Sequence, residues 1–428
     1  MIDALYKIFL KYRKISTDTR KEINDSLFFA LSGENFNGNL FAADALSKGA
    51  ALAVVDDPSV VPEDDKRYFL VGNVLDTLQA MAKFHRNQFN IPVLGITGTN
   101  GKTTTKELVS AVLETEKNIL YTRGNLNNHI GVPLTLLQLN EEIEIAVVEM
   151  GANHPGEIGE LCALARPTHG IITNIGKAHL EGFGSFENVI RTKNELYESV
   201  RTDKGTVFVP QENPLLMELS EGINRITYGS SGTVAGSLEA ENPFLSVRWM
   251  KEHNLVHLNT RMYGSYNFQN IMAAVAVGNY FGISESGIQK ALAEYSPQNN
   301  RSQMMKTDRN TLLMDAYNAN PDSLKLAIED FGRQQLPNKM VIVGDMFELG
   351  KQAREEHQHM VELIQSQNFE KVILVGKDFC ATSFPTEFLT FATTDDAENY
   401  LKANPVKEST ILIKGSRGMH LEQLIKQL

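Results

Sequence analysis

The sequence predicts an α/β protein with three domains, of which the central one is built on a parallel sheet. Short continuous apolar runs alternate with helical segments, a pattern typical of parallel sheets covered on both faces. A glycine-rich turn ending in Gly-Lys-Thr, within residues 94–105, separates one such run from a helix. A chain of 428 residues is long enough for roughly two to four domains, which we place at residues 1–88, 89–298 and 299–428.

Residues 1–88 are predicted to form a small α/β unit. Strand-like runs occur at residues 27–31, 51–55 and 68–71, and helical patterns at 42–48 and 75–87. Residues 299–428 repeat this alternation, with strands expected at 311–315, 340–344, 371–375 and 410–414 and helices at 321–334 and 354–367. Asn320 can cap the first of these helices, with Pro321 in its first turn, and the whole segment is typical of a Rossmann-like domain.

The central segment begins with an apolar strand at residues 91–96, followed by the glycine-rich turn and a helix at 106–113. Such a turn directs backbone N–H groups at a polyphosphate, while Lys102 neutralises phosphate charge and the Thr103 hydroxyl reaches Mg²⁺. The spacing departs from the common P-loop, and the alternative is a βα turn that binds nothing. We expect ATP binding. Further strands are predicted at 145–149, 170–174 and 206–209.

Polar residues follow the predicted strands, where the ligands of open α/β sheets bind. Glu149 ends one strand and is placed to hold Mg²⁺ with Thr103; the alternative is a solvated carboxylate. Asn174, His179 and Glu181 lie on the loop after the next strand, where His179 is either structural or functional. Ser185 can cap the following helix. Composition alone indicates that Lys193, on that helix, is an exposed lysine.

Two further groups suit a nucleotide. Asn267 and Asn270 lie three residues apart, on one face of a predicted helix, and their amides can read a purine edge or, for Asn267, cap the helix. Arg301 can reach back to the γ-phosphate, and Asp315 at a strand end suits a ribose hydroxyl. The loops at 344–350 and 414–417 follow two strand ends, where substrate loops belong.

These motifs together resemble the Mur ligase superfamily of ATP-dependent amide-bond-forming enzymes. The family's nucleotide loop, Thr-Gly-Thr-Asn-Gly-Lys-Thr, is present at 97–103, and residues 124–135, 149–153 and 178–185 look like its central-domain signatures. The segments 315–323 and 344–350 resemble the branch that adds D-alanyl-D-alanine. In the first domain, residues 16–20 and 33–38 resemble a uridine-nucleotide site, although Thr19 replaces the usual Ser.

The resemblance implies a set of site residues. The implied catalytic residues are Lys102, Lys193, His179 and Arg301. The implied ATP contacts are Gly98, Thr99, Asn100, Gly101, Lys102, Thr103, Thr104, Asn267, Asn270, Arg301 and Asp315. The implied metal ligands are Thr103, Glu149, His179 and Lys193. The implied substrate contacts are Ser16, Thr19, Arg20, position 36 (Phe36), Asn127, Asn128, Ser185, Tyr317, Asn318 and Asn320.

The resemblance also implies the chemistry. The cofactors are ATP, two Mg²⁺ ions and CO₂, which converts Lys193 to a carbamate and so reverses the reading of an ordinary exposed lysine. The substrates are UDP-N-acetylmuramoyl-tripeptide, bound by the first domain, and D-alanyl-D-alanine, bound by the last. An acyl phosphate forms between them, and closure of the last domain brings Arg301 and Asp315 to the nucleotide and excludes water.

Several alternatives stay open. A sister ligase that adds diaminopimelate or lysine shares the fold, but its Asp-Asn-Pro-Arg motif is absent from this sequence. Folylpolyglutamate synthetase shares the core but has no use for a uridine-nucleotide domain. A P-loop regulatory ATPase would make no bond. We further expect a cytoplasmic monomer that binds no nucleic acid and does not insert into membranes, because the net charge is −11 and no apolar run is long enough to span a bilayer.

The two cysteines, Cys162 and Cys380, are far apart and in no metal-ligand spacing, so we expect reduced thiols. The N-terminal residues lack the pattern of a signal peptide. Both observations fit the expected cytoplasmic location.

Overall fold

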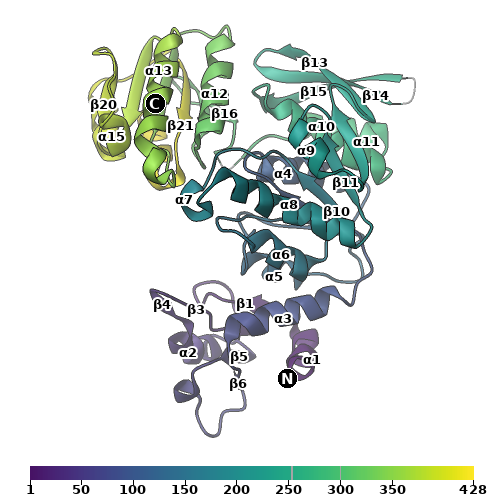
Figure 1. Cartoon of the computed structure of the whole chain (residues 1–428). Coiled ribbons are helices and arrows are strands. Elements are labelled where there is room, and N and C mark those ends of the chain that lie inside the picture. Colours follow the sequence, from purple (N-terminus) through teal and green to yellow (C-terminus); the bar gives the residue numbers. More distant parts are fainter. Residues whose placement is uncertain (252–253, 299) are drawn as a thin grey trace.

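The computed structural model describes residues 1–251, 254–298 and 300–428. It contains three large β-sheets, each with its own helices, and the central sheet lies between the other two parts of the chain (Figure 1). The predicted α/β class is confirmed.

The N-terminal part is a four-stranded parallel sheet in the order β1-β2-β5-β6. Its strands are Ile15–Ser16, Leu27–Phe29, Leu52–Val55 and Tyr68–Leu70. The helices are α1 (Ile2–Tyr12), α2 (Ala42–Ser47) and α3 (Val74–Arg86), with 3₁₀ turns η1 (Gly38–Phe41) and η2 (Pro58–Val60). A small hairpin, β3 (Ser32–Gly33) and β4 (Phe36–Asn37), projects from the sheet.

Helix α3 joins the N-terminal part to the central part. Helix α1 packs against it, and so do helices α5 and α6 of the central part. Its residues Leu78 and Met81 belong to one apolar cluster that includes Leu27 and Val54 of the N-terminal sheet and Leu161 of the central part. The two parts therefore share a continuous core.

The central part holds a nine-stranded sheet in the order β15-β14-β13-β12-β11-β10-β7-β9-β8. Its strands, β7 to β15 in chain order, are Val93–Thr97, Ile119–Tyr121, Ile145–Glu149, His169–Ile172, Thr206–Pro210, Asn224–Gly229, Val234–Glu241, Phe244–Lys251 and Asn254–Tyr263. The predicted parallel pairing holds for the other pairs of this sheet, while β13, β14 and β15 pair antiparallel, which the prediction did not include. The burial of β15 alternates along most of its length, as expected for an antiparallel strand with one solvated face.

Helices cover both faces of this sheet. One face carries α4 (Lys102–Leu113), α10 (Asn267–Tyr280) and α11 (Glu285–Glu294), and the other carries α5 (Gly131–Leu136), α6 (Glu157–Ala165) and α8 (Phe186–Thr202). Two short helices, α7 (Leu180–Phe183) and α9 (Pro214–Leu219), lie in loops. Helix α4 begins at Lys102 rather than at residue 106, so the glycine loop leads directly into the helix.

The C-terminal part is a six-stranded sheet in the order β16-β17-β21-β18-β19-β20. Its strands, β16 to β21 in chain order, are Gln303–Lys306, Thr311–Asp315, Lys339–Gly344, Lys371–Val375, Leu389–Phe391 and Thr410–Lys414. Only β16 runs antiparallel to its neighbour among the described pairs. The helices and 3₁₀ turns are α12 (Pro321–Arg333), η3 (Gly350–Gln352), α13 (Ala353–Ser366), α14 (Lys377–Cys380), α15 (Thr394–Ala403), η4 (Arg417–Met419) and η5 (Leu421–Gln427).

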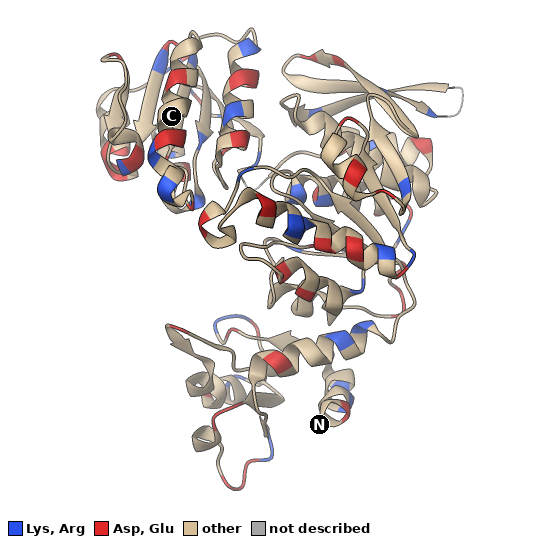
Figure 2. Cartoon of the chain, in the orientation of Figure 1, with Lys and Arg blue, Asp and Glu red and all other residues tan. Residues whose placement is uncertain are grey.

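Within the described residues, none of the helices combines the length and apolar character needed to cross a bilayer. Figure 2 shows acidic and basic residues interspersed along the helices of all three parts. Cys162 is buried, Cys380 is exposed, and both are free thiols.

Candidate active site

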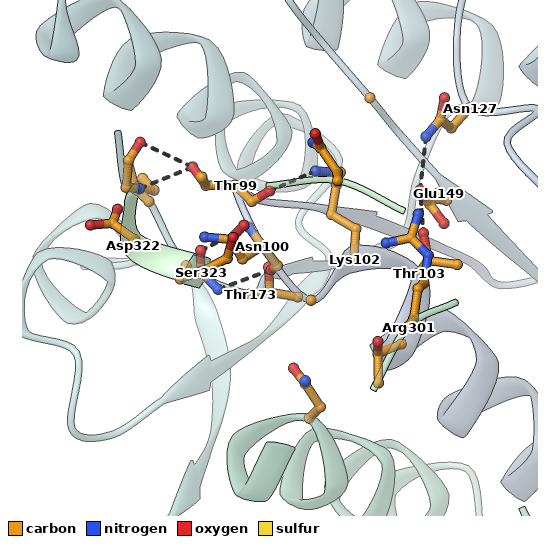
Figure 3. A pocket seen from close by; sticks show the side chains of 18 of the residues that line it. Thr99, Asn100, Lys102, Thr103, Asn127, Glu149, Thr173, Arg301, Asp322 and Ser323 are labelled. Atoms are coloured by element: carbon orange, nitrogen blue, oxygen red, sulfur yellow. Dashed lines mark hydrogen bonds between the residues drawn. The ribbon is translucent and has the colours of Figure 1, made fainter. Parts of the chain in front are cut away.

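A cavity of about 900 Å³ lies where the central part faces the C-terminal part. The glycine loop, the end of β9, the loops after β10 and β11 and the start of α10 form its central wall. The C-terminal wall is formed by Arg301, Ser302, Asp315, Tyr317, Asn318, Asp322, Ser323, Leu326 and Lys414. Figure 3 labels Arg301, Asp322 and Ser323 of this wall.

The glycine loop is held in a conformation that only glycine adopts without strain. Gly98 and Gly101 have φ angles of +144° and +79°, and a Cβ on Gly98 would lie 2.0 Å from the Thr173 hydroxyl. The Asn100 N–H donates to Asn174 Oδ1 over 3.0 Å, and Asn174 Nδ2 donates to the Asn100 carbonyl over 2.9 Å. The segment that follows β10 therefore fixes the shape of the glycine loop.

Lys102 stands at the start of α4 and donates from Nζ to the carbonyls of Gly98 and Thr99, over 2.7 and 3.0 Å. Burial lowers the pKa of Lys102 to about 8, against the opposing effect of Glu149 and with a contribution from the positive charge of Arg301. The lysine thus lies beside the loop that would surround a phosphate. Its ammonium group is held by the carbonyls of that loop.

Glu149 is buried at the end of β9. Its Oε1 accepts from the Thr103 hydroxyl over 3.1 Å and from Asn127 Nδ2 over 2.8 Å. Its Oε2 is buried and has no hydrogen-bond partner among the described residues. A carboxylate oxygen left without a partner beside a Thr hydroxyl fits the oxygen ligands that Mg²⁺ prefers, so these residues fit a divalent cation.

Lys193 lies on α8 and is only 2% exposed, so the sequence reading of an exposed helical lysine is wrong. Its Nζ lies 5.6 Å from the centre of the Phe183 ring. Burial holds the pKa of Lys193 well below its ordinary value, with a further contribution from the charge of Lys102 and against the effect of Glu157 and Glu195. Side chains from other elements bury this lysine, and no local pattern in α8 reveals them.

Asn267 and Asn270 are both buried near the glycine loop, but they bond to protein groups. Asn270 Nδ2 donates to Asn267 Oδ1 over 2.8 Å, and Asn270 Oδ1 accepts from Thr105 over 3.0 Å. Asn267 donates to the Tyr263 carbonyl and does not cap α10, so the capping reading is wrong. Both line the cavity, together with Gln269, whose buried Oε1 has no partner among the described residues.

The C-terminal wall brings Arg301 and Asp315 to the cavity. The Arg301 guanidinium lies 3.7 Å from the centre of the Tyr317 ring. Asp315 accepts from Lys414 Nζ over 2.6 Å and from the Ser302 N–H over 3.2 Å. The carboxylate that we expected to bind a ribose hydroxyl is therefore already paired with a lysine. The sequence assigns that lysine only to a substrate loop.

Several contacts join the C-terminal part to the loops of the central part that surround the cavity. Asn320 Nδ2 donates to Asn100 Oδ1 over 2.7 Å, and the Lys177 N–H donates to an Asp322 oxygen over 2.9 Å. His179 pairs through Nδ1 with Glu348. The predicted capping of α12 by Asn320 is confirmed, and the Asn320 N–H in turn donates to Ser323 Oγ. Since these contacts connect residues far apart in sequence, local patterns could not reveal them.

Other predicted residues lie elsewhere or have structural partners. Gly98 belongs to the loop, and Thr99, Thr104 and Asn128 line the cavity, although Asn128 Oδ1 accepts from the Ile130 and Gly131 N–H groups. Ser185 caps α8. Ser16 lines a second cavity of about 350 Å³, next to α5 of the central part. Thr19 and Arg20 are outside that lining, Arg20 pairs with Asp18, and the exposed Phe36 stacks on Phe41.

Comparisons with known protein families identify the class to which this chain belongs. Residues 96–278 match the family described as the Mur ligase middle domain, and residues 300–417 match the Mur ligase, glutamate ligase domain. The two matches cover the two parts whose walls form the cavity. The class of protein is therefore a Mur ligase.

Relatives that match nearly the whole chain identify the particular family within this class. A UDP-N-acetylmuramoyl-tripeptide–D-alanyl-D-alanine ligase of Bacillus subtilis is 34% identical, over 97% of this chain and 92% of its own length. A crystal structure of MurF from Acinetobacter baumannii is 30% identical with a TM-score of 0.87, covering 97% of this chain and 93% of that one. MurF ligase from Thermotoga maritima in complex with ADP is 25% identical with a TM-score of 0.86, covering 98% and 97%. The chain therefore belongs to the UDP-N-acetylmuramoyl-tripeptide–D-alanyl-D-alanine ligase family of the Mur ligases.

Proposed function

We propose that this chain is an ATP-dependent ligase that joins D-alanyl-D-alanine to UDP-N-acetylmuramoyl-tripeptide, giving the pentapeptide, ADP and phosphate. The observation that carries the proposal is the single cavity in which Lys102 and Glu149 face Arg301. We place the enzyme in the cytoplasm, as a monomer. The first 88 residues would bind the UDP end of the substrate, residues 89–298 ATP, and residues 299–428 the dipeptide.

The chemistry follows from the reactants. A carboxylate is a poor electrophile, and it gains a good leaving group when one of its oxygens attacks the γ-phosphorus of ATP and ADP departs. The amine of the dipeptide then attacks the acyl carbon, phosphate leaves, and the attacking nitrogen loses a proton. Lys102 and Arg301 offset the repulsion between the carboxylate and the phosphates, and they hold both reactants in place. No protein nucleophile takes part.

The donor set at β9 supports a magnesium site. Thr103 and the free Oε2 of Glu149 would hold one Mg²⁺, which would neutralise phosphate charge when bound. His179 pairs through Nδ1 with Glu348, so Nε2 is the ring nitrogen with which it would bind a metal.

Lys193 is proposed to react with CO₂. Its neutral amine attacks the carbon, the nitrogen releases a proton, and an anionic carbamate results that would hold a second Mg²⁺. The lowered pKa of the buried Lys193 supports this step, because only the neutral amine reacts.

The test is phosphate release with ATP, Mg²⁺, UDP-N-acetylmuramoyl-tripeptide and D-alanyl-D-alanine, omitting one component at a time. We expect release only with all four, and a UDP-linked pentapeptide by mass spectrometry. Release that needs another amino acid instead of the dipeptide would indicate a sister ligase or a folylpolyglutamate synthetase. Release that is indifferent to both acceptor substrates would indicate a regulatory ATPase and overturn the proposal.

A further inference from the structure

Two arginines meet at one aromatic ring on the C-terminal wall. The guanidinium carbon of Arg301 lies 3.7 Å from the centre of the Tyr317 ring, and that of Arg417 lies 5.3 Å from it. Arg417 Nη1 also donates to the Tyr317 hydroxyl over 3.4 Å. Among the described residues, neither arginine forms an ion pair with a carboxylate.

The nearest acid on the strand that leads to Tyr317 does not balance these charges. Asp315 is bound to Lys414 over 2.6 Å, and that lysine is 3% exposed, so the pair is internally neutral. The positive charges of the two guanidinium groups beside the ring are then not balanced by a neighbouring carboxylate. Guanidinium binds carboxylate and phosphate through paired hydrogen bonds, so this arrangement fits an anionic ligand.

The loop that carries Arg417 is fixed before any ligand arrives. The Phe347 N–H donates to Ser416 Oγ over 2.9 Å, and the Ser416 N–H donates to the Asp345 carbonyl over 3.2 Å. A Cβ on Gly418 would lie 2.7 Å from the Phe347 ring, so the loop packs closely on the 344–350 segment. The position of Arg417 relative to the cavity is therefore set by the fold.

The two arginines differ in their place. Arg301 lines the nucleotide cavity and is close enough to Lys102 to affect its charge, so the phosphates of ATP suit Arg301. Arg417 is exposed and does not line that cavity. It therefore suits an anion that lies just outside the space of the phosphates.

We propose that Arg417 binds the α-carboxylate of the incoming dipeptide, with Tyr317 holding its guanidinium. This rests on the proposed function. The amine of the dipeptide must reach the acyl phosphate inside the cavity, and its carboxylate lies at the opposite end, about 7 Å away in an extended dipeptide. Arg417, which lies outside the cavity but contacts the same Tyr317 ring as Arg301, is placed for that end.

The test compares D-alanyl-D-alanine with its C-terminal amide, which lacks the carboxylate charge, in the full chain. For the unaltered enzyme we expect kcat/KM to be about 10- to 100-fold lower for the amide. Arg417→Gln should raise KM for the dipeptide by a similar factor, leave KM for ATP unchanged, and abolish the preference for the dipeptide over the amide. Arg417→Lys should restore part of it, and Lys402→Gln, an exposed cation on α15, should change nothing.

The preference ratio separates binding from folding, because a variant that is merely less stable loses activity with both acceptors equally. An unchanged ratio in Arg417→Gln, with Arg417→Lys likewise unchanged, would overturn the proposal. So would a rise in KM for ATP in place of KM for the dipeptide, which would put Arg417 on phosphate. Failure of the unaltered enzyme to use D-alanyl-D-alanine would overturn the proposed function itself, independently of either variant.

Discussion

The two walls of the cavity use their polar side chains differently. On the central wall, Glu149 keeps one oxygen without a partner, and the contacts of Lys102 are to carbonyls of its own loop. On the C-terminal wall, Asp315 is paired with Lys414, and Asn320 both caps a helix and bonds to Asn100. The polar groups of the central wall are therefore available to a ligand. Many of those on the C-terminal wall instead bond to other groups of the C-terminal part or to the central wall.

The largest expected effect comes from removing Lys193, the buried lysine of α8. We expect Lys193→Ala to lower kcat by at least about 10²-fold, because an anion near the phosphates is lost. Short carboxylic acids should restore part of the activity by occupying the vacated space. Arg191→Ala, an exposed cation on the same helix, is the control. A Lys193→Ala enzyme with the original rate would refute the carbamate.

The second test addresses the free carboxylate oxygen. Glu149→Gln should lower activity by about 10²-fold and raise the Mg²⁺ concentration required, since an amide binds magnesium more weakly than a carboxylate does. The measurement is a magnesium titration of the rate at saturating ATP. Glu142→Gln, at an exposed position, should leave the titration unchanged. An unaltered magnesium requirement in Glu149→Gln would remove Glu149 from the metal site.

The third test uses pH. The pKa of Lys102 in the free enzyme is lowered to about 8, so the lysine loses its charge as pH rises through that value. A bound phosphate favours the charged form, so the Kd for ADP should rise above pH 8 by up to about tenfold per pH unit. Calorimetric titration from pH 7 to 10 measures it. Lys102→Arg keeps its charge throughout and should show no such slope; a parallel slope in that variant would assign the effect to another group.

The smallest effect concerns the C-terminal wall. Asn320→Ala removes a helix cap and should cost about 1 kcal/mol of unfolding free energy. Asn73→Ala removes the cap of α3, far from the cavity, and should cost about the same amount. Only the first should also change the KM for ATP, because only Asn320 contacts the glycine loop. Urea unfolding measures the loss of stability in both variants, and steady-state kinetics measure their KM for ATP. Equal KM values would mean that the contact with the glycine loop does not affect ATP binding.

The central wall could be predicted from sequence because its signals are local. The loop at residues 97–103 and Glu149 at a strand end are positions that a one-dimensional pattern identifies. The antiparallel strands were equally visible in the alternation of residues 254–263, which the prediction of a parallel sheet overlooked.

The remaining features depend on contacts between distant segments. The burial of Lys193 arises from packing against other elements, so only a resemblance to a family pointed to it. The Asn100–Asn320 contact joins residues 220 positions apart, and Lys414 reaches Asp315 across 99 positions. Nothing in the local sequence specifies either partner, because the first contact depends on how the C-terminal part sits against the central part, and the second on the pairing of β17 with β21.

The apolar cluster that runs through α3 has a consequence for dissecting the molecule. A fragment lacking residues 1–88 would expose the faces of α5 and α6 that α3 covers, and an isolated N-terminal sheet would lose part of its interior. In a calorimeter, residues 1–298 should therefore melt as a single cooperative unit. We therefore expect that cutting the polypeptide near residue 88, although that boundary is visible as a change of sheet, would destabilise both fragments.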